Sequence, residues 1–190
     1  MSIPAPSRAK SVRRVIVRAA ICVAVCVAMV LAFYVSLIAS AGSLTIDQKH
    51  TVRRAIALLR DRGFAGDIVL LDKITVFRAD DNWLNATVAK ENAFAATNFP
   101  FAIITLYSDF FTYPSDDVER AAILLHESRH LRGEDEHAAY RYVWLNRKQL
   151  GWTSDKYADS QVWDNIRRQT REHVPELFNC PQRRSTDCTE

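Results

Sequence analysis

The sequence predicts a small α+β domain, with helices packed on a short mixed sheet, that follows a single N-terminal transmembrane helix. Residues 19–38 form a run of twenty residues without a charge, which is long enough to cross a bilayer. Further along, stretches with helical periodicity alternate with short runs rich in β-branched and aromatic residues. A chain of 190 residues has room for one such domain and this appendage.

The charge-free run is interpreted as a membrane anchor. At about 1.5 Å per residue its helix spans roughly 30 Å, the thickness of the hydrocarbon layer. Ala39-Ser40-Ala41 also fits a signal-peptide cleavage site, but the apolar core of a signal peptide has only about 7–15 residues. The predicted organisation is a cytoplasmic basic segment (residues 1–18), a transmembrane anchor or uncleaved signal (residues 19–41), an exported domain (residues 43–178) and a C-terminal tail (residues 179–190).

The distribution of charge predicts the orientation of the anchor. Five basic residues and no acidic residue precede Ala19, and positively charged flanks stay in the cytoplasm. We therefore expect the membrane as a partner of the N-terminal helix and the domain in the periplasm or the extracellular space. The rest of the chain has 20 basic and 22 acidic residues, a net charge of −2, which argues against nucleic acid as a partner.

The four cysteines form two pairs with different predicted roles. Cys22 and Cys26 lie within the charge-free run, where they are expected to face lipid or another helix. Cys180 and Cys188 lie in the tail, on the predicted outer side of the membrane. Because that compartment is oxidising, a disulfide that closes this small loop is expected. Metal binding by this pair is the weaker alternative, since no histidine or second cysteine pair lies close to it in the sequence.

The elements of the domain follow one another along the chain. Residues 43–62 have apolar side chains at helical spacing and end at Gly63. Asp116 and Glu119 resemble a capping box that begins the next long helix. In chain order we expect a helix over residues 43–62, strands over residues 68–71 and 74–77, a stretch without a clean period over residues 82–98, a strand that runs into a loop over residues 99–111, a helix that stops at Gly133, a helix from about Glu134 to Gly151, and a helix over residues 159–172.

The helix before Gly133 carries the motif His126-Glu127-Ser128-Arg129-His130. Two histidines four residues apart lie on one helix face, so that both imidazoles can reach one metal ion at about 2.0–2.1 Å. Glu127 then falls beside the ion, where a carboxylate can take a proton from a metal-bound water. The alternative is a helix with two ordinary polar histidines, although buried histidines need partners.

A metal site with two histidines needs a third protein ligand. The candidates lie just downstream of the motif: Glu134, Asp135, Glu136 and His137. Glu134 would lie two turns from His126 if the helix continued, which is too far to share one ion. If Gly133 ends the helix, a later residue can fold back; Glu136 fits best and His137 is the second candidate.

The motif resembles that of the zincin metallopeptidases, the superfamily that shares H-E-x-x-H. The metzincin branch also has a methionine turn, and this chain has methionine only at positions 1 and 29. The stretch of residues 99–140 is more similar to the deuterolysin-like, or aspzincin, group, in which a glycine, an acidic ligand and a tyrosine follow the motif. Gly133, Glu136 and Tyr140 stand in those places, with three departures: glutamate replaces aspartate, the tyrosine is one position late, and the gap before Gly133 is short.

The resemblance implies a zincin-like domain that hydrolyses peptide bonds. It implies Zn²⁺ held by His126, His130 and Glu136, with Glu127 as general base and then general acid. Tyr140 would donate a hydrogen bond to the developing oxyanion. By analogy, the strand at residues 103–106 would pair with an extended peptide or protein substrate along its edge.

A second function stays open from the sequence. The chain could be a non-catalytic exported binding or scaffold domain, with a structural metal or a vestigial motif. The domain is short and has no evident pro-segment or insertion that would form a substrate cleft. His50 and His173 are isolated in the sequence, and surface or core roles are expected for both.

Overall fold

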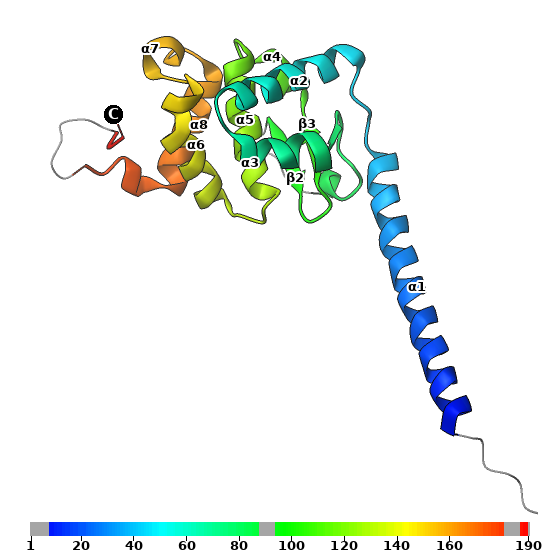
Figure 1. Cartoon of the computed structure of the whole chain (residues 1–190). Helices are drawn as coiled ribbons and strands as arrows, with labels where there is room; N and C mark the ends of the chain where they lie inside the picture. The colour runs from blue at the N-terminus through cyan, green and yellow to red at the C-terminus, as the bar shows by residue number, and fades with distance from the viewer. Residues whose placement is uncertain (1–7, 88–93, 181–186, 190) are drawn as a thin grey trace, which may run out of the picture.

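The computed structural model describes residues 8–87, 94–180 and 187–189 (Figure 1). Eight α-helices, three short strands and three single-turn helical segments occur within these residues. In chain order they are α1 (Arg8–Ser40), α2 (Ile46–Asp61), α3 (Ala65–Ile68), the π-helical turn η1 (Val69–Ile74), β1 (Val76–Arg78), the 3-10 turn η2 (Asn85–Thr87), β2 (Ala95–Asn98), β3 (Ile103–Leu106), α4 (Ser108–Thr112), α5 (Asp117–His130), α6 (Glu136–Leu150), α7 (Ser154–Tyr157), α8 (Gln161–His173) and the 3-10 turn η3 (Pro175–Leu177).

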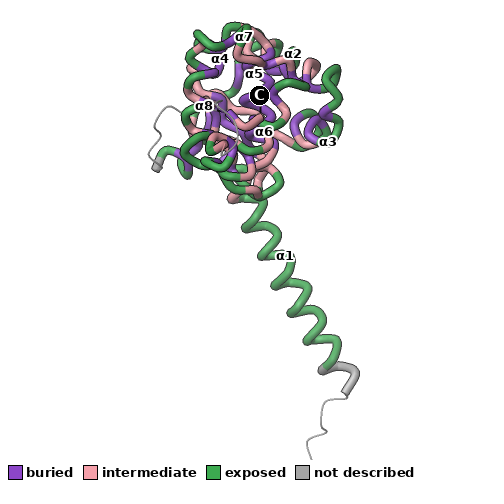
Figure 2. Tube along the Cα trace, turned by 90° about the vertical axis from the view of Figure 1, so that its left-hand side faces the viewer, coloured by how far each residue is buried: buried purple, intermediate pink, exposed green. Residues whose placement is uncertain are grey.

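Helix α1 extends away from the folded domain and contains the charge-free run (Figure 1). Within the described part of the chain it is the one helix long and apolar enough to cross a membrane, over Val12–Ser40. Most of it is exposed, including Cys22 and Cys26 (Figure 2). Only its last turns contact the domain, where Leu37 is fully buried. Residues 1–7 of the predicted basic segment lie outside the described residues.

The sheet is small and mixed, as the sequence predicts, and its strand order is β1-β3-β2. β1 runs parallel to β3, and β2 runs antiparallel to it. β3 is therefore the central strand, and all four of its residues are buried. The expectation that residues 103–106 offer a free edge to a substrate is wrong, because β3 has a partner on each side. β2 is an outer strand of the sheet and lies in the stretch, residues 82–98, where the sequence has no clean period. Residues 88–93 of that stretch are outside the described part.

One predicted strand is helical. Residues 68–71 belong to α3 and η1, and Thr75 N–H donates to Leu70 O at 3.0 Å as η1 ends. The buried residues Phe64, Ile68 and Leu71 are three or four positions apart, which is a helical spacing. A short apolar run does not distinguish a buried strand from a buried helix. The strand predicted at residues 74–77 is present as β1, which begins two residues later and ends one residue later.

The ends of the helices follow local sequence signals. At the start of α5, Asp116 Oδ1 accepts hydrogen bonds from Val118 N–H and Glu119 N–H. In a capping box the Glu119 side chain would accept in return from Asp116 N–H, but it accepts from Ser115 N–H instead. Only half of the predicted capping box is therefore present. α6 begins at Glu136 and not Glu134, because Asp135 caps it through Ala138 N–H. Gly133 and Gly151 have φ of 77° and 80°, the left-handed conformation that ends a helix.

The core surrounds α5, which packs between α2, α6 and the sheet (Figure 1). Five consecutive residues of α5, Ala121, Ala122, Ile123, Leu124 and Leu125, are buried on all sides. Trp144, Trp152 and Trp163 form one aromatic cluster beside it. Since α5 is buried along most of its length, the core anchors its last turn and the side chains that end it.

The described part of the tail is attached to α6. The predicted disulfide joins Cys180 to Cys188, with their Cα atoms 5.4 Å apart. Next to it Asp187 is 1% exposed and accepts from Arg147 Nη2 at 2.9 Å and from Trp144 Nε1 at 3.0 Å. A buried, fully bonded ion pair thus holds the tail against the core; residues 181–186 of the loop are outside the described part.

Candidate metal centre

His126 and His130 face one point at the end of α5. Their Nε2 atoms are 3.0 Å apart and their rings are nearly perpendicular, at 74°. His126 is buried and His130 is partly buried. The i, i+4 spacing gives this arrangement, and the packing around α5 keeps both rings from turning outward.

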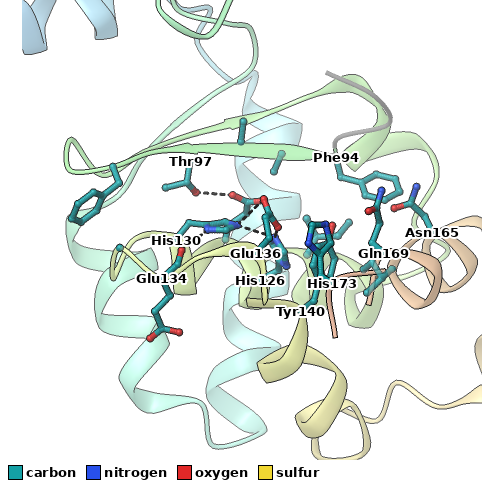
Figure 3. Close-up of a pocket in the computed structure, with 17 residues that line it drawn as sticks. Phe94, Thr97, His126, His130, Glu134, Glu136, Tyr140, Asn165, Gln169 and His173 are labelled. Atoms are coloured by element: carbon teal, nitrogen blue, oxygen red, sulfur yellow. Dashed lines mark hydrogen bonds and ion pairs between the residues drawn. The ribbon is translucent and has the colours of Figure 1, made fainter. Parts of the chain in front are cut away.

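Glu136 reaches the same point from α6. Its Oε2 lies 3.2 Å from His126 Nε2, and its Oε1 lies 3.5 Å from His130 Nε2 (Figure 3). The connection turns at Gly133, where the ring of Phe99 would lie only 3.2 Å from an added Cβ. The left-handed backbone at Gly133 and the cap at Asp135 together place the first residue of α6 above the last turn of α5.

The three side chains have the separations of a tetrahedral metal site. Bonds of 2.0–2.1 Å at tetrahedral angles put neighbouring ligand atoms about 3.3 Å apart. The distances of 3.0, 3.2 and 3.5 Å bracket that value, and all the ligand atoms lie within 4.8 Å of one another. Two imidazoles and one carboxylate form a donor set suited to a divalent transition metal and leave a fourth position open.

The outer nitrogens of the two histidines differ. His130 Nδ1 donates to the carbonyl oxygen of Glu134 at 2.9 Å, so that in the neutral ring the lone pair lies on Nε2, which faces the centre. His126 Nδ1 is buried and has no hydrogen-bond partner among the described residues. The centre therefore has an outer hydrogen bond on only one of its histidines.

The three side chains of the metal cluster, His126, His130 and Glu136, shift one another's protonation. Hydrogen bonds from His126 and His130 hold the pKa of Glu136 far below its usual range. Burial by itself lowers the pKa of His130, but the bond to Glu136 and the negative charge of Glu127 outweigh it and raise that pKa to about 9. At neutral pH the metal-free cluster holds a proton, which a metal ion would displace on binding.

Glu127 lies beside the cluster and is held by a second element. The hydroxyl of Thr97, in β2, donates to Glu127 Oε2 at 2.6 Å (Figure 3). Glu127 is 5% exposed but lines the same pocket as the histidines. One oxygen of the carboxylate is thus fixed by Thr97.

Tyr140 packs directly on the cluster. It lies one helical turn after Glu136 in α6, and its ring centroid is 4.3 Å from that of His126. Burial, together with the charges of Glu136 and Glu127, raises the pKa of Tyr140 well above its usual range. The hydroxyl therefore stays protonated at neutral pH and is able to donate.

The other candidates for the third ligand point elsewhere. His137 is half exposed, and its Nε2 lies 3.1 Å from Glu176 Oε1. Glu134 pairs with Arg129 and points away from the histidines (Figure 3). Asp135 caps α6. Of the four candidates for the third ligand, Glu136 alone faces both histidines.

The cluster lies in an open pocket of about 670 Å³. β2 and Phe94 border it on one side, and α8 borders it on the other. From α8, Ile166 and three polar residues line it; the polar residues are Asn165, Gln169 and His173, each four positions from the next (Figure 3). His173 stacks on Tyr140, with centroids 5.2 Å apart and planes 13° apart.

Several pocket residues were not identified from the sequence. Thr97 lies in a stretch without a clean period, so no local pattern marks it. His173 was expected to be isolated, but it belongs to the polar i, i+4, i+8 stripe of α8, which is visible in the sequence as a face and could have been noted. His50, by contrast, is exposed, and it is not among the residues that line the pocket.

Comparison with known proteins finds no matching family model, no matching curated protein and no matching solved structure. The resemblance to zincins therefore rests on the residues and motif of the sequence.

Proposed function

We propose that this chain is a membrane-anchored, zinc-dependent peptidase whose domain lies outside the cytoplasm. The observation that carries the proposal is the triangle of His126, His130 and Glu136, with the carboxylate of Glu127 beside it in an open pocket. A zinc ion bound there would lower the pKa of a coordinated water to about 7 and polarise a carbonyl group.

The residues of the chain have distinct roles in this proposal. Glu127 accepts the proton of the attacking water and passes it to the leaving amine. Thr97 fixes one carboxylate oxygen of Glu127, so that the other is free to face the water. Tyr140 keeps its proton at neutral pH and donates a hydrogen bond to the oxyanion that develops on the scissile carbonyl.

The pocket suits an extended polypeptide. β2 has a strand partner only on its β3 side among the described strands, and its Ala96 and Thr97 line the pocket. The backbone of a peptide is able to pair with that outer edge of β2, while the polar stripe of α8 faces it from the other wall. This replaces residues 103–106 as the proposed substrate-binding strand.

The location rests on the N-terminal helix and the tail. The basic flank before Ala19 favours a cytoplasmic N-terminus, and α1 has the length to span the bilayer. A disulfide between Cys180 and Cys188 is typical of a domain in an oxidising compartment.

The test compares wild-type protein with Glu127→Gln, both as the full chain in detergent. We expect about one zinc per chain in both proteins, hydrolysis of a dye-labelled protein by the wild type, and no hydrolysis by Glu127→Gln. Glu172→Gln, an exposed change on α8, is the matched control and should retain activity. Absence of zinc would rule out the proposal. Zinc without hydrolysis in the wild type would support the non-catalytic binding domain instead.

A further inference from the structure

Aromatic side chains connect the end of α1 to the domain. The ring of Phe101, in the β2–β3 turn, lies 5.2 Å from that of Phe33 and 6.2 Å from that of Tyr34. The ring of Trp83 meets Phe33 edge-on at 5.5 Å. Two separate loops of the domain are thus packed along the last turns of the anchor helix.

Hydrogen bonds fix Trp83 against the same helix. Its indole Nε1–H donates to Ser36 Oγ at 3.2 Å, and its backbone N–H donates to Ser40 Oγ at 3.3 Å. Because both donors are satisfied by α1, Trp83 presents no unpaired N–H to an apolar medium. The side chain is nevertheless 46% exposed.

The position of these contacts along α1 determines their depth in a bilayer. Arg18 marks the inner end of the charge-free run, and residues 19–38 span about 30 Å, which is no more than the hydrocarbon thickness. Phe33 lies five residues before Ile38, or about 7 Å inside the outer end of that span. If Phe33 lay outside the bilayer, only residues 19–32 would remain, which is about 21 Å and too short. Phe101 must therefore share the depth of the outer acyl layer.

Exposed apolar residues continue this surface beyond the anchor. Phe99, at the other end of the β2–β3 turn, is 59% exposed, and Leu84, next to Trp83, is 37% exposed. Aromatic side chains, tryptophan above all, concentrate at the boundary between lipid headgroups and acyl chains. Phe99 also lines the metal pocket and covers Gly133.

We propose that the surface formed by Trp83, Leu84, Phe99 and Phe101 docks into the outer boundary of the lipid bilayer beside α1. The partner is the bilayer itself, and continuity with the anchor helix is the reason for this assignment. Since Phe99 belongs to both surfaces, the metal pocket then opens next to the membrane. The inference rests on the proposed insertion of α1, and it needs neither zinc nor peptide hydrolysis.

The test uses tryptophan fluorescence of the full chain in phosphatidylcholine vesicles that contain brominated lipid, which quenches only tryptophans in contact with acyl chains. Trp144, Trp152 and Trp163 are buried in the core, so quenching should come from Trp83 alone. We expect wild-type emission to fall in brominated vesicles and Trp83→Phe emission to stay unchanged. Absence of quenching in the wild type, or equal quenching in the variant, would overturn the proposal.

Two further variants in the Trp83→Phe background separate docking from insertion of the anchor. Phe99→Trp adds a reporter on the proposed surface. Leu145→Trp adds one at an exposed position of α6, across the domain from α1 (Figure 1). We expect at least twofold stronger quenching at position 99 than at position 145, whereas equal values would contradict docking. Flotation with the vesicles reports whether α1 inserts, and failure to float would overturn the anchor and the docking together. A chain that floats and is quenched but does not hydrolyse peptides would refute only the proposed activity.

Discussion

The hydroxyl of Thr97 donates a 2.6 Å hydrogen bond to the carboxylate of Glu127, although the two residues are thirty positions apart and belong to β2 and α5. The strand that borders the pocket thereby positions the proposed catalytic carboxylate. In the proposed function the same strand also offers its outer edge to a substrate. Under that proposal, substrate binding along β2 and the orientation of the base are coupled through one side chain.

Thr97→Val should reduce peptide hydrolysis about 10–150-fold while zinc content stays the same. Valine keeps the shape of threonine but removes the donor, and a hydrogen bond to a charged group is worth about 1.5–3 kcal/mol. Thr97→Ser keeps the hydroxyl and should retain most of the activity. The measurements are kcat with a labelled peptide and metal analysis of each protein. Full activity in Thr97→Val, or an equal loss in Thr97→Ser, would contradict a role for the hydrogen bond.

Glu136→Ala should weaken zinc binding far more than His137→Ala. Glu136 faces both histidines, whereas His137 pairs with Glu176 on the surface. Removing a residue that only hydrogen-bonds to a metal ligand typically weakens metal affinity 10–100-fold. Because Glu136 would bind the metal directly, we expect its removal to weaken the affinity roughly 100-fold or more. Competition with a chromophoric chelator measures the affinities. A larger effect at His137 would reassign the third ligand.

Asp116→Ala should lower the free energy of unfolding by about 1–2 kcal/mol at neutral pH, since Asp116 caps the helix that carries the metal motif. Asp116→Asn keeps the cap and should cost less. Thermal unfolding in detergent measures both.

The effect of Asp116 should also depend on pH. Burial opposes the change, but hydrogen bonds from Lys156, Tyr157 and the helix N-terminus lower the pKa of Asp116 below its ordinary 3.8. A carboxyl group with a lowered folded-state pKa stabilises the fold above its unfolded-state pKa and loses this contribution as the pH falls through the folded-state value. The difference between wild type and Asp116→Ala should be full at pH 7 and shrink below about pH 4. A difference that grows on acidification would contradict this account.

Asp187→Ala should cost about 3 kcal/mol of stability, because it leaves the buried guanidinium of Arg147 without the carboxylate of its ion pair. Glu172→Ala is the matched control: it removes an exposed ion pair with Arg168 and should cost less than about 0.5 kcal/mol. Urea unfolding of the full chain, followed by the fluorescence of the core tryptophans, compares the two. Similar values would mean that the tail does not stabilise the domain.

The sequence predicts best the features that depend on neighbours along the chain. The charge-free run, the mixed α+β content, the motif helix and the disulfide all follow from local composition or spacing. The prediction was wrong at residues 68–71, where a short apolar run suits both a strand and a helix and the packing of α3 and η1 against α2 and α5 selects the helix. At residues 103–106 the strand was predicted, but its central place in the sheet was not.

The sequence by itself determined that His126 and His130 share one helix face with Glu127 beside them, because helix periodicity is a local property. Only the tertiary structure decided that Glu136, and not His137, closes the triangle. That choice depends on the left-handed turn at Gly133, the ring of Phe99 packed over it, and the angle at which α6 crosses α5. Thr97, His173 and the docking surface beside α1 likewise depend on segments distant in sequence. Their proximity comes from burial of a shared core, which no local pattern of residues specifies.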